Sequence, residues 1–253
     1  MHGTGHWLTA SPSTPQGDLL TNDEFRVGIC VRFGTRPPFL QDMCDGCGAA
    51  TDLHHALTCT VGGLVIARHG LVLDVLMELA ELAFGESRVG YEPTIFPPGY
   101  KHPEANGQRG DLNIKHLWAR NINCIIDVII PHAEGPSNMK KTPQAVVLNA
   151  QLKKKREYGA LCKANRKHFT PFAVTTSGLL APEAKALLKC FARALADKWE
   201  QPLSVTSNYV YTKVSFAVVR ATHDNIFSAR TRSGHGKCPV FGTDPTTPPI
   251  PGN

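Results

Sequence analysis

The stretch from Cys44 to Cys59, "CDGCGAATDLHHALTC", places three cysteines and two histidines within sixteen residues. Its Cys44-x2-Cys47 pair supplies two thiolates from one turn, and Gly46 and Gly48 permit the tight backbone that such a pair needs. Zinc prefers four soft or borderline ligands in a tetrahedron. The segment therefore predicts a small loop closed around one metal ion.

Either of two neighbouring histidines can complete this site together with Cys59. His55 gives the spacing C-x2-C-x7-H-x3-C, whereas His54 gives C-x2-C-x6-H-x4-C. The alternative interpretation is coincidence, with the cysteines as inert core residues. A site closed by four protein ligands has no open position, so the metal is expected to stabilise the fold rather than to catalyse. Zinc knuckles of this kind often contact nucleic acid.

The remaining cysteines are expected to stay reduced. The chain begins without a basic and apolar secretory segment, and no apolar stretch approaches ~20 residues, so we expect neither secretion nor a transmembrane helix. Disulfides are rare outside oxidising compartments. With 42% hydrophobic residues among 253, the chain can bury a core without such crosslinks. Cys124, Cys162 and Cys190 lie in apolar or helical patterns typical of core positions.

Hydrophobic periodicity predicts an α/β domain. Apolar residues recur at helical spacing in 63–84, and the expected order is then strand, strand, strand, helix, strand, helix, helix. The last of these, 204–230, is rich enough in β-branched residues to leave a strand as the alternative. This order is typical of a small mixed sheet flanked by helices. The expected divisions are an N-terminal segment (1–40), a zinc knuckle (41–62), the α/β domain (63–232) and a disordered tail (233–253).

Positive charge is concentrated in one part of the chain. Residues 140–167 hold nine Lys and Arg against one acidic residue, while the whole chain has a formal net charge of +6. Clustered cations gain affinity for nucleic acid by releasing counterions from the phosphate backbone. The alternative is a solvated helix face. Under the first interpretation, the phosphate-contacting residues are Lys153, Arg156, Lys163, Arg166 and Lys167.

Two aspartates suggest a second metal site. Asp127 interrupts the apolar run 122–130, and Asp111 lies near the start of another expected strand. A buried acid is costly unless it is paired or holds a cation, and carboxylates are preferred ligands of Mg²⁺. If the two strands are neighbours, the carboxylates can converge. The alternative is that Asp111 caps a turn after Gly110 and that Asp127 pairs with a lysine.

The expected helix 142–167 offers cations to such a site. Its residues Gln151, Lys154, Lys155 and Tyr158 follow the spacing i, i+3, i+4 and i+7, which is one helix face. A lysine beside a metal-bound carboxylate can position water or stabilise charge that develops on a phosphate.

Several motifs together resemble a known family. They are "CDGCG", "HHALTC", "GGLVIARH", "RGDL", "CIIDV", "KKKREY" and "HFTPFAVTTSGLLAPEAKALLK". From Trp7 to Phe227 the chain resembles the C-terminal region of non-LTR retrotransposon polyproteins. In that family a CCHC-type zinc knuckle accompanies a restriction-like endonuclease of the PD-(D/E)xK type.

The resemblance implies a fold and a set of site residues. The implied fold is restriction-endonuclease-like, a small mixed sheet flanked by helices and preceded by the zinc knuckle. The implied zinc ligands are Cys44, Cys47, His55 (or His54) and Cys59. The implied magnesium ligands are Asp111, Asp127 and, as a third acid, Glu92. The implied catalytic residues are Asp111, Asp127, Lys154 or Lys155, and Tyr158.

The chain departs from the family pattern at three positions. Gly110 stands where the family has proline before the first aspartate, and Glu157 stands where it often has lysine before Tyr158. The usual third-motif lysine is replaced by Ile129, so the family's alternative lysine on the following helix is expected to serve instead.

The resemblance also implies an activity. The expected reaction is Mg²⁺-dependent nicking of target DNA, whose 3′-hydroxyl then primes reverse transcription. The expected partners are DNA and, as a second possibility, element RNA, with no membrane and a nuclear location. The chain has no room for a reverse transcriptase, so we expect a fragment, a truncated copy or a separately encoded descendant. Two alternatives remain, a catalytically inactive nucleic-acid-binding remnant and an inert relic. The sequence leaves the oligomeric state open.

Overall fold

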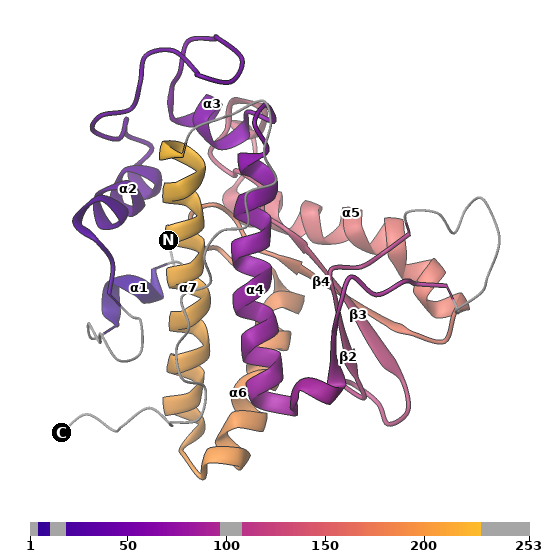
Figure 1. The fold of residues 1–253 in the computed structure, drawn as a ribbon. Coiled ribbons are helices and arrows are strands. Elements are labelled where there is room, and N and C mark those ends of the chain that lie inside the picture. Colours follow the sequence, from indigo (N-terminus) through magenta and orange to yellow (C-terminus); the bar gives the residue numbers. More distant parts are fainter. Residues whose placement is uncertain (1–4, 11–18, 97–107, 229–253) are drawn as a thin grey trace.

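The computed structural model describes residues 5–10, 19–96 and 108–228 (Figure 1). Its helices are α1 (His6–Thr9), α2 (Asn22–Phe33), α3 (Leu53–Thr58), α4 (Leu64–Phe84), α5 (Pro143–Ala164), α6 (Pro182–Trp199) and α7 (Leu203–Phe227). Its strands are β1 (Val89–Tyr91), β2 (Leu112–Lys115), β3 (Asn123–Ile129) and β4 (His168–Ala173). From residue 63 onward the expected element order is confirmed, and the segment with two interpretations is the helix α7. The helices α1, α2 and α3 were not predicted.

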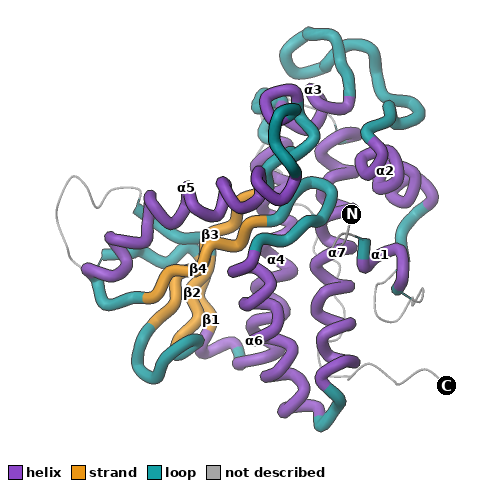
Figure 2. The backbone as a smooth tube through the Cα atoms, turned by 180° about the vertical axis from the view of Figure 1, so that it is seen from behind, coloured by secondary structure: helices purple, strands orange, loops and turns teal. Residues whose placement is uncertain are grey.

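The four strands form one mixed sheet in the order β1-β2-β3-β4. The first three strands are antiparallel, and β3 pairs with β4 in parallel. A parallel pair requires a long crossover, which α5 provides. Figures 1 and 2 show α5 on one side of the sheet and α4, α6 and α7 on the other. The expected mixed sheet with flanking helices is therefore present.

Strand β3 is buried on both faces, which explains its nearly continuous apolar sequence. Cys124, Ile126 and Val128 belong to the main core with α4, α6 and α7. Ile125 lies in a separate cluster with Cys162 of α5. Because successive side chains alternate between faces, Asp127 shares the α5 side of the sheet with Ile125.

Helix α5 begins as its sequence predicts. The Thr142 side chain accepts a hydrogen bond from the Ala145 N–H at 3.2 Å, and Pro143 occupies the first helical turn. Proline is favoured there because that position needs no N–H donor. This start fixes which residues of α5 reach the sheet one and two turns further on.

The N-terminal segment and the segment expected to be a zinc knuckle pack against the end of α7. Val27 and Val31 of α2 form one buried cluster with Leu53 and Leu57 of α3 and with Ile226 of α7. The segments expected as 1–40 and 41–62 therefore share a core with the α/β domain. The expected disordered tail, 233–253, lies outside the described residues.

The cysteines and the length of the helices can be stated for the described residues. Their seven cysteines are free thiols. None of their helices is long and apolar enough to cross a membrane.

Candidate metal centre and acidic site

Four side chains of the knuckle gather at one point. The ligand atoms of Cys44, Cys47, His55 and Cys59 all lie within 4.8 Å of one another. The Sγ atoms of Cys44 and Cys59 are 3.9 Å apart, and Cys47 Sγ lies 3.3 Å from His55 Nε2. Gly48 closes the turn with φ of 74°, a conformation that favours glycine. These residues form a cluster that can bind a metal ion such as zinc.

The structure distinguishes the two neighbouring histidines. Helix α3 is capped by Asp52, whose side chain accepts a hydrogen bond from the His55 N–H at 2.7 Å. With the helix so placed, His55 joins the cysteines, while His54 Nδ1 lies 2.8 Å from His132 Nε2. His132 Nδ1 in turn lies 3.0 Å from the Thr176 hydroxyl. His55 is therefore the histidine of the cluster, and His54 connects α3 to the segment that follows β3.

Hydrogen bonding favours the metal-binding form of one cysteine. Burial raises the pKa of Cys44, but hydrogen bonds from the Cys47 and Gly46 backbones and from the His55 side chain lower it further, to about 6. Burial raises the pKa of Cys59. Since the thiolate is the form that binds metal, Cys44 is partly prepared for a ligand role.

The charge and the packing of the knuckle favour a structural role. Residues 41–62 include three Asp and no Lys or Arg, so the segment supplies no Lys or Arg to a phosphate backbone. The buried Arg68 of α4 donates to the Leu57 carbonyl of α3 at 2.9 Å and to Asn225 Oδ1 of α7 at 2.7 Å. The same guanidinium thereby ties α3 to both long helices.

The two aspartates lie on neighbouring strands. Asp111 comes directly before β2, whose first residue, Leu112, pairs with Ile126 of β3, the residue before Asp127. Asp111 Oδ2 accepts a hydrogen bond from the Val128 N–H at 2.6 Å. Asp111 is thus held at the edge of β3, next to Asp127.

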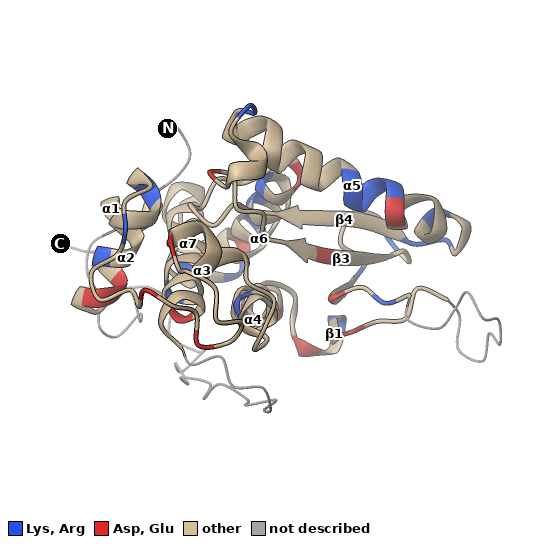
Figure 3. Ribbon diagram, turned by 90° about the horizontal axis from the view of Figure 1, so that it is seen from above, with Lys and Arg blue, Asp and Glu red and all other residues tan. Residues whose placement is uncertain are grey.

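Asp127 is buried against a lysine. Its side chain is 6% exposed, and Lys154 Nζ of α5 lies 2.8 Å from its Oδ2. Lys154 is thus the cation that partners this buried carboxylate oxygen, and the ion pair joins β3 to α5. Burial, with help from the Asp111 charge, raises the pKa of Asp127 to about 6, while Lys154 and His69 oppose the rise. Figure 3 shows the acidic position of β3 beside the charged part of α5.

His69 of α4, which is not among the predicted site residues, completes this group. Its Nε2 lies 3.0 Å from Asp111 Oδ2. Burial lowers the pKa of His69, but the hydrogen bond and charge of Asp111 and the charge of Asp127 raise it further, so the net shift is upward. We call His69, Asp111, Asp127 and Lys154 the acidic site. His69 ends the motif "GGLVIARH", but that motif does not predict the contact, which joins residues 42 positions apart.

The four residues of the predicted α5 face make contacts in two different places. Lys154 lies with its Nζ 5.1 Å from the centre of the Tyr158 ring, toward Asp127. Lys155 instead forms an ion pair with Glu183 of α6, whose N–H donates to Gln151 Oε1 at 3.0 Å. Of the two candidate lysines, the structure brings Lys154 to the acidic site.

Glu92 and Gly110 surround Asp111 through the backbone. The Glu92 N–H donates to the Asp111 carbonyl at 3.0 Å, while its half-exposed carboxylate lies 3.6 Å from Arg109. The third acid is therefore near Asp111, but its side chain pairs with Arg109. At Gly110 a Cβ atom would lie 2.2 Å from Ile125 Cγ2, so close packing explains the glycine at this position.

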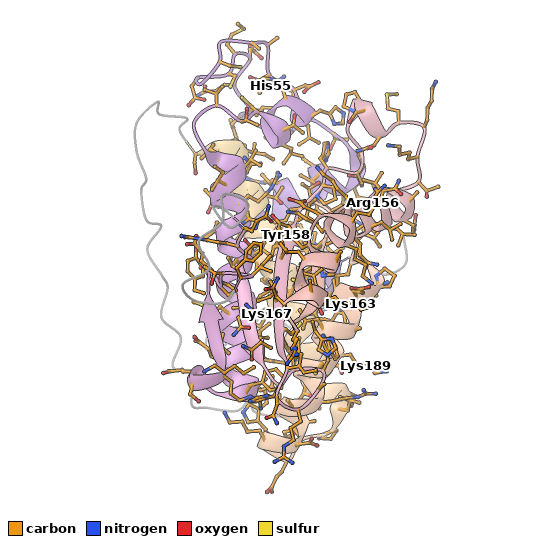
Figure 4. The ribbon with its side chains drawn as sticks, turned by 90° about the vertical axis from the view of Figure 1, so that its right-hand side faces the viewer. His55, Arg156, Tyr158, Lys163, Lys167 and Lys189 are labelled. Carbon is orange, nitrogen blue, oxygen red and sulfur yellow. The ribbon has the colours of Figure 1, made fainter. Side chains whose placement is uncertain are left out.

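The predicted phosphate-contacting residues lie on or just after α5. Lys153, Arg156, Lys163 and Arg166 are exposed; we call these four residues the α5 surface. Figure 4 shows Arg156 and Lys163 on the same side of the molecule as Tyr158, with His55 at its far upper end. Lys167 is partly buried, and its Nζ donates to the Thr94 carbonyl at 2.7 Å.

Comparisons with known proteins give no family. No protein-family model matches the chain, and no curated protein matches it.

Proposed function

We propose that the chain is a Mg²⁺-dependent DNA endonuclease domain of the restriction-like type, with a structural zinc knuckle. The observation that carries this proposal is the pair of carboxylates on adjacent strands, Asp111 and the buried Asp127, with the Lys154 ammonium of α5 2.8 Å from Asp127 Oδ2. The neighbouring Asp111 charge raises the pKa of Asp127, and a divalent cation bound by both carboxylates would relieve this repulsion.

The donor set fits Mg²⁺. Asp111 and Asp127 offer oxygen ligands from adjacent strands, and Mg²⁺ is commonly bound by one or two carboxylates plus waters and substrate phosphates. Among the described residues, the Cys44 cluster is the one close gathering of three or more His, Cys, Asp or Glu ligands. The acidic site is not such a gathering, because it supplies two carboxylates. Water and a DNA phosphate would complete the coordination of Mg²⁺ there.

The surrounding residues have distinct roles in this proposal. A bound Mg²⁺ would activate water and stabilise charge on the scissile phosphate. Lys154 holds an ammonium beside Asp127, where it can stabilise developing negative charge. Tyr158 fixes the lysine by lying beneath it at 5.1 Å. The α5 surface holds the flanking DNA backbone, with Lys167 beside it.

The zinc ligands proposed are Cys44, Cys47, His55 and Cys59. Their donor set is that of a closed structural zinc site, which stabilises the loop and catalyses nothing. The wider role proposed is nicking of target DNA by a non-LTR retrotransposon protein, in the nucleus, with element RNA as a second partner. This rests on the family resemblance of the motifs.

A second function has one observation in its favour. The direct Lys154–Asp127 ion pair neutralises both groups without a metal. A nucleic-acid-binding remnant without catalysis would keep this pair, and its binding would survive the loss of both aspartates.

The test is the nicking of supercoiled plasmid by purified protein in Mg²⁺. Under the proposal, Asp111→Asn and Asp127→Asn abolish nicking but leave DNA binding within about twofold, since the α5 surface is unchanged. Asp197→Asn, an exposed position on α6, is the matched control and should nick normally. Binding that persists without any Mg²⁺-dependent nicking by the wild type identifies the remnant instead.

A further inference from the structure

His69 makes a contact that the proposed chemistry leaves unexplained. It extends from α4, on the side of the sheet opposite α5, and its Nε2 reaches Asp111 Oδ2 at 3.0 Å. The histidine side chain is 32% exposed and the aspartate 21%. The pair is therefore shielded from water more than an ordinary surface ion pair, so the attraction between the two groups is screened less.

The orientation of His69 is fixed by its neighbour. Arg68 is 4% exposed and is held by the Leu57 carbonyl and by Asn225 Oδ1. Because these bonds fix the rotation of α4 about its axis, the next residue has little freedom in direction. Val72, one turn further on, is also buried in the main core. The helix thus presents the His69 ring to Asp111 as part of its packing.

Two donors act on a single oxygen of Asp111. The Val128 N–H at 2.6 Å and His69 Nε2 at 3.0 Å both reach Oδ2. One donor leaves a carboxylate free to turn about its Cβ–Cγ bond, whereas two donors from different elements fix its plane. The other oxygen, Oδ1, then remains as the candidate ligand atom for a cation.

We propose that His69 is a positioning residue, which holds the Asp111 carboxylate in the orientation required for binding a divalent cation. This inference rests on the proposed endonuclease function. Partners of this kind, which orient a ligand without touching the metal, typically contribute 10–100-fold in metal affinity or activity.

The test compares three proteins in two assays. His69→Ala should raise the Mg²⁺ concentration for half-maximal plasmid nicking about 10-fold and weaken Mn²⁺ binding, measured by calorimetry without DNA, by a similar factor. His69→Gln keeps an N–H donor at nearly the same reach and should return both values to within about threefold of the wild type. The plateau rate at saturating Mg²⁺ should change less than the half-saturation value.

The matched control is His223→Ala. His223 forms another His–Asp contact of 3.0 Å, with Asp224, on α7 and outside the acidic site. The His223→Ala variant should bind Mn²⁺ and nick DNA like the wild type. If His69→Ala lowers the melting temperature, Mn²⁺ affinity is compared at a temperature where every variant stays folded; weaker binding there supports the positioning role, and unchanged binding overturns it.

The two proposals fail in different ways. Unchanged Mn²⁺ affinity and Mg²⁺ half-saturation in His69→Ala, with an active wild type, overturn the role of His69 and leave the endonuclease standing. A wild type that binds Mn²⁺ but never nicks, with weaker binding in His69→Ala, refutes the endonuclease and supports the positioning role. A wild type that neither binds Mn²⁺ nor nicks DNA refutes both.

Discussion

The contact between His54 and His132 makes a quantitative prediction about stability and pH. The His132 side chain is 3% exposed, and burial, with smaller effects from His54 and Arg68, lowers its pKa from 6.5 to about 4. The folded protein therefore keeps His132 neutral between these two pH values, while the unfolded chain takes up a proton. Since the unfolded state binds more protons in this window, the free energy of unfolding decreases as the pH falls.

The magnitude follows from the shift. At pH 5, about 1.5 units below the unfolded pKa and still above the folded one, the loss is about 2 kcal/mol relative to neutral pH, at 1.36 kcal/mol per unit. The full loss, reached below pH 4, is about 3 kcal/mol. His132→Asn removes this titration while keeping a polar group of similar size at the position.

The assay is urea unfolding of both proteins at pH 7, 6 and 5 under identical metal conditions. The variant should be less stable at pH 7, because the partners of His132, His54 and Thr176, lose hydrogen bonds. The difference between the two proteins should then shrink by about 2 kcal/mol on going to pH 5. Metal loss and other titrations affect both proteins, so they cancel in the difference. Parallel stability curves over this range would refute the reasoning.

Three further outcomes are expected. Lys154→Met should reduce Mg²⁺-dependent nicking at least 100-fold, whereas Lys155→Met, which breaks only the Glu183 pair, should change the rate less than threefold; equal losses would contradict the assignment. Cys47→Ser should lower the zinc content of purified protein from one equivalent toward zero and lower its melting temperature, both measurable by metal analysis and calorimetry. Gly110→Ala should destabilise the fold by about 1–3 kcal/mol in chemical unfolding, since the new methyl group would overlap Ile125. An unchanged unfolding midpoint would contradict this, because it would mean that β3 shifts to accept the methyl group at no cost.

The fold followed from hydrophobic period, except where the period was ambiguous. Residues 203–227 contain many β-branched side chains, and strand propensity competed with helical spacing there. The structure shows why the helix prevails. Val210, Val214 and Val218 fall on one face, four residues apart, and pack into the main core with α4 and α6. Tertiary packing therefore decides what local propensity leaves open.

The candidate site was predictable in its parts and less so in its assembly. Asp127 could be identified because it is an acidic residue within an apolar strand, where an unpaired charge is costly to bury. The choice between Lys154 and Lys155 depended on how α5 docks on the sheet, since neighbouring helix positions point about 100° apart. The choice between His54 and His55 depended on α3 in the same way. His69 reaches Asp111 from another layer of the fold, and no pattern in the chain encodes that meeting.

A single turn of α4 links the two centres of the molecule. Arg68 keeps its charge at neutral pH, since burial lowers its pKa only to about 10, and it anchors α3 below the cysteines. The adjacent His69 touches Asp111. If the knuckle holds zinc and Asp111 binds Mg²⁺ as proposed, a chelator that removes the zinc would loosen an anchor one residue away from His69, which contacts that carboxylate. Inactivation by a chelator would then result from the loosened contact between α3 and α4. It would not show that the zinc takes part in catalysis.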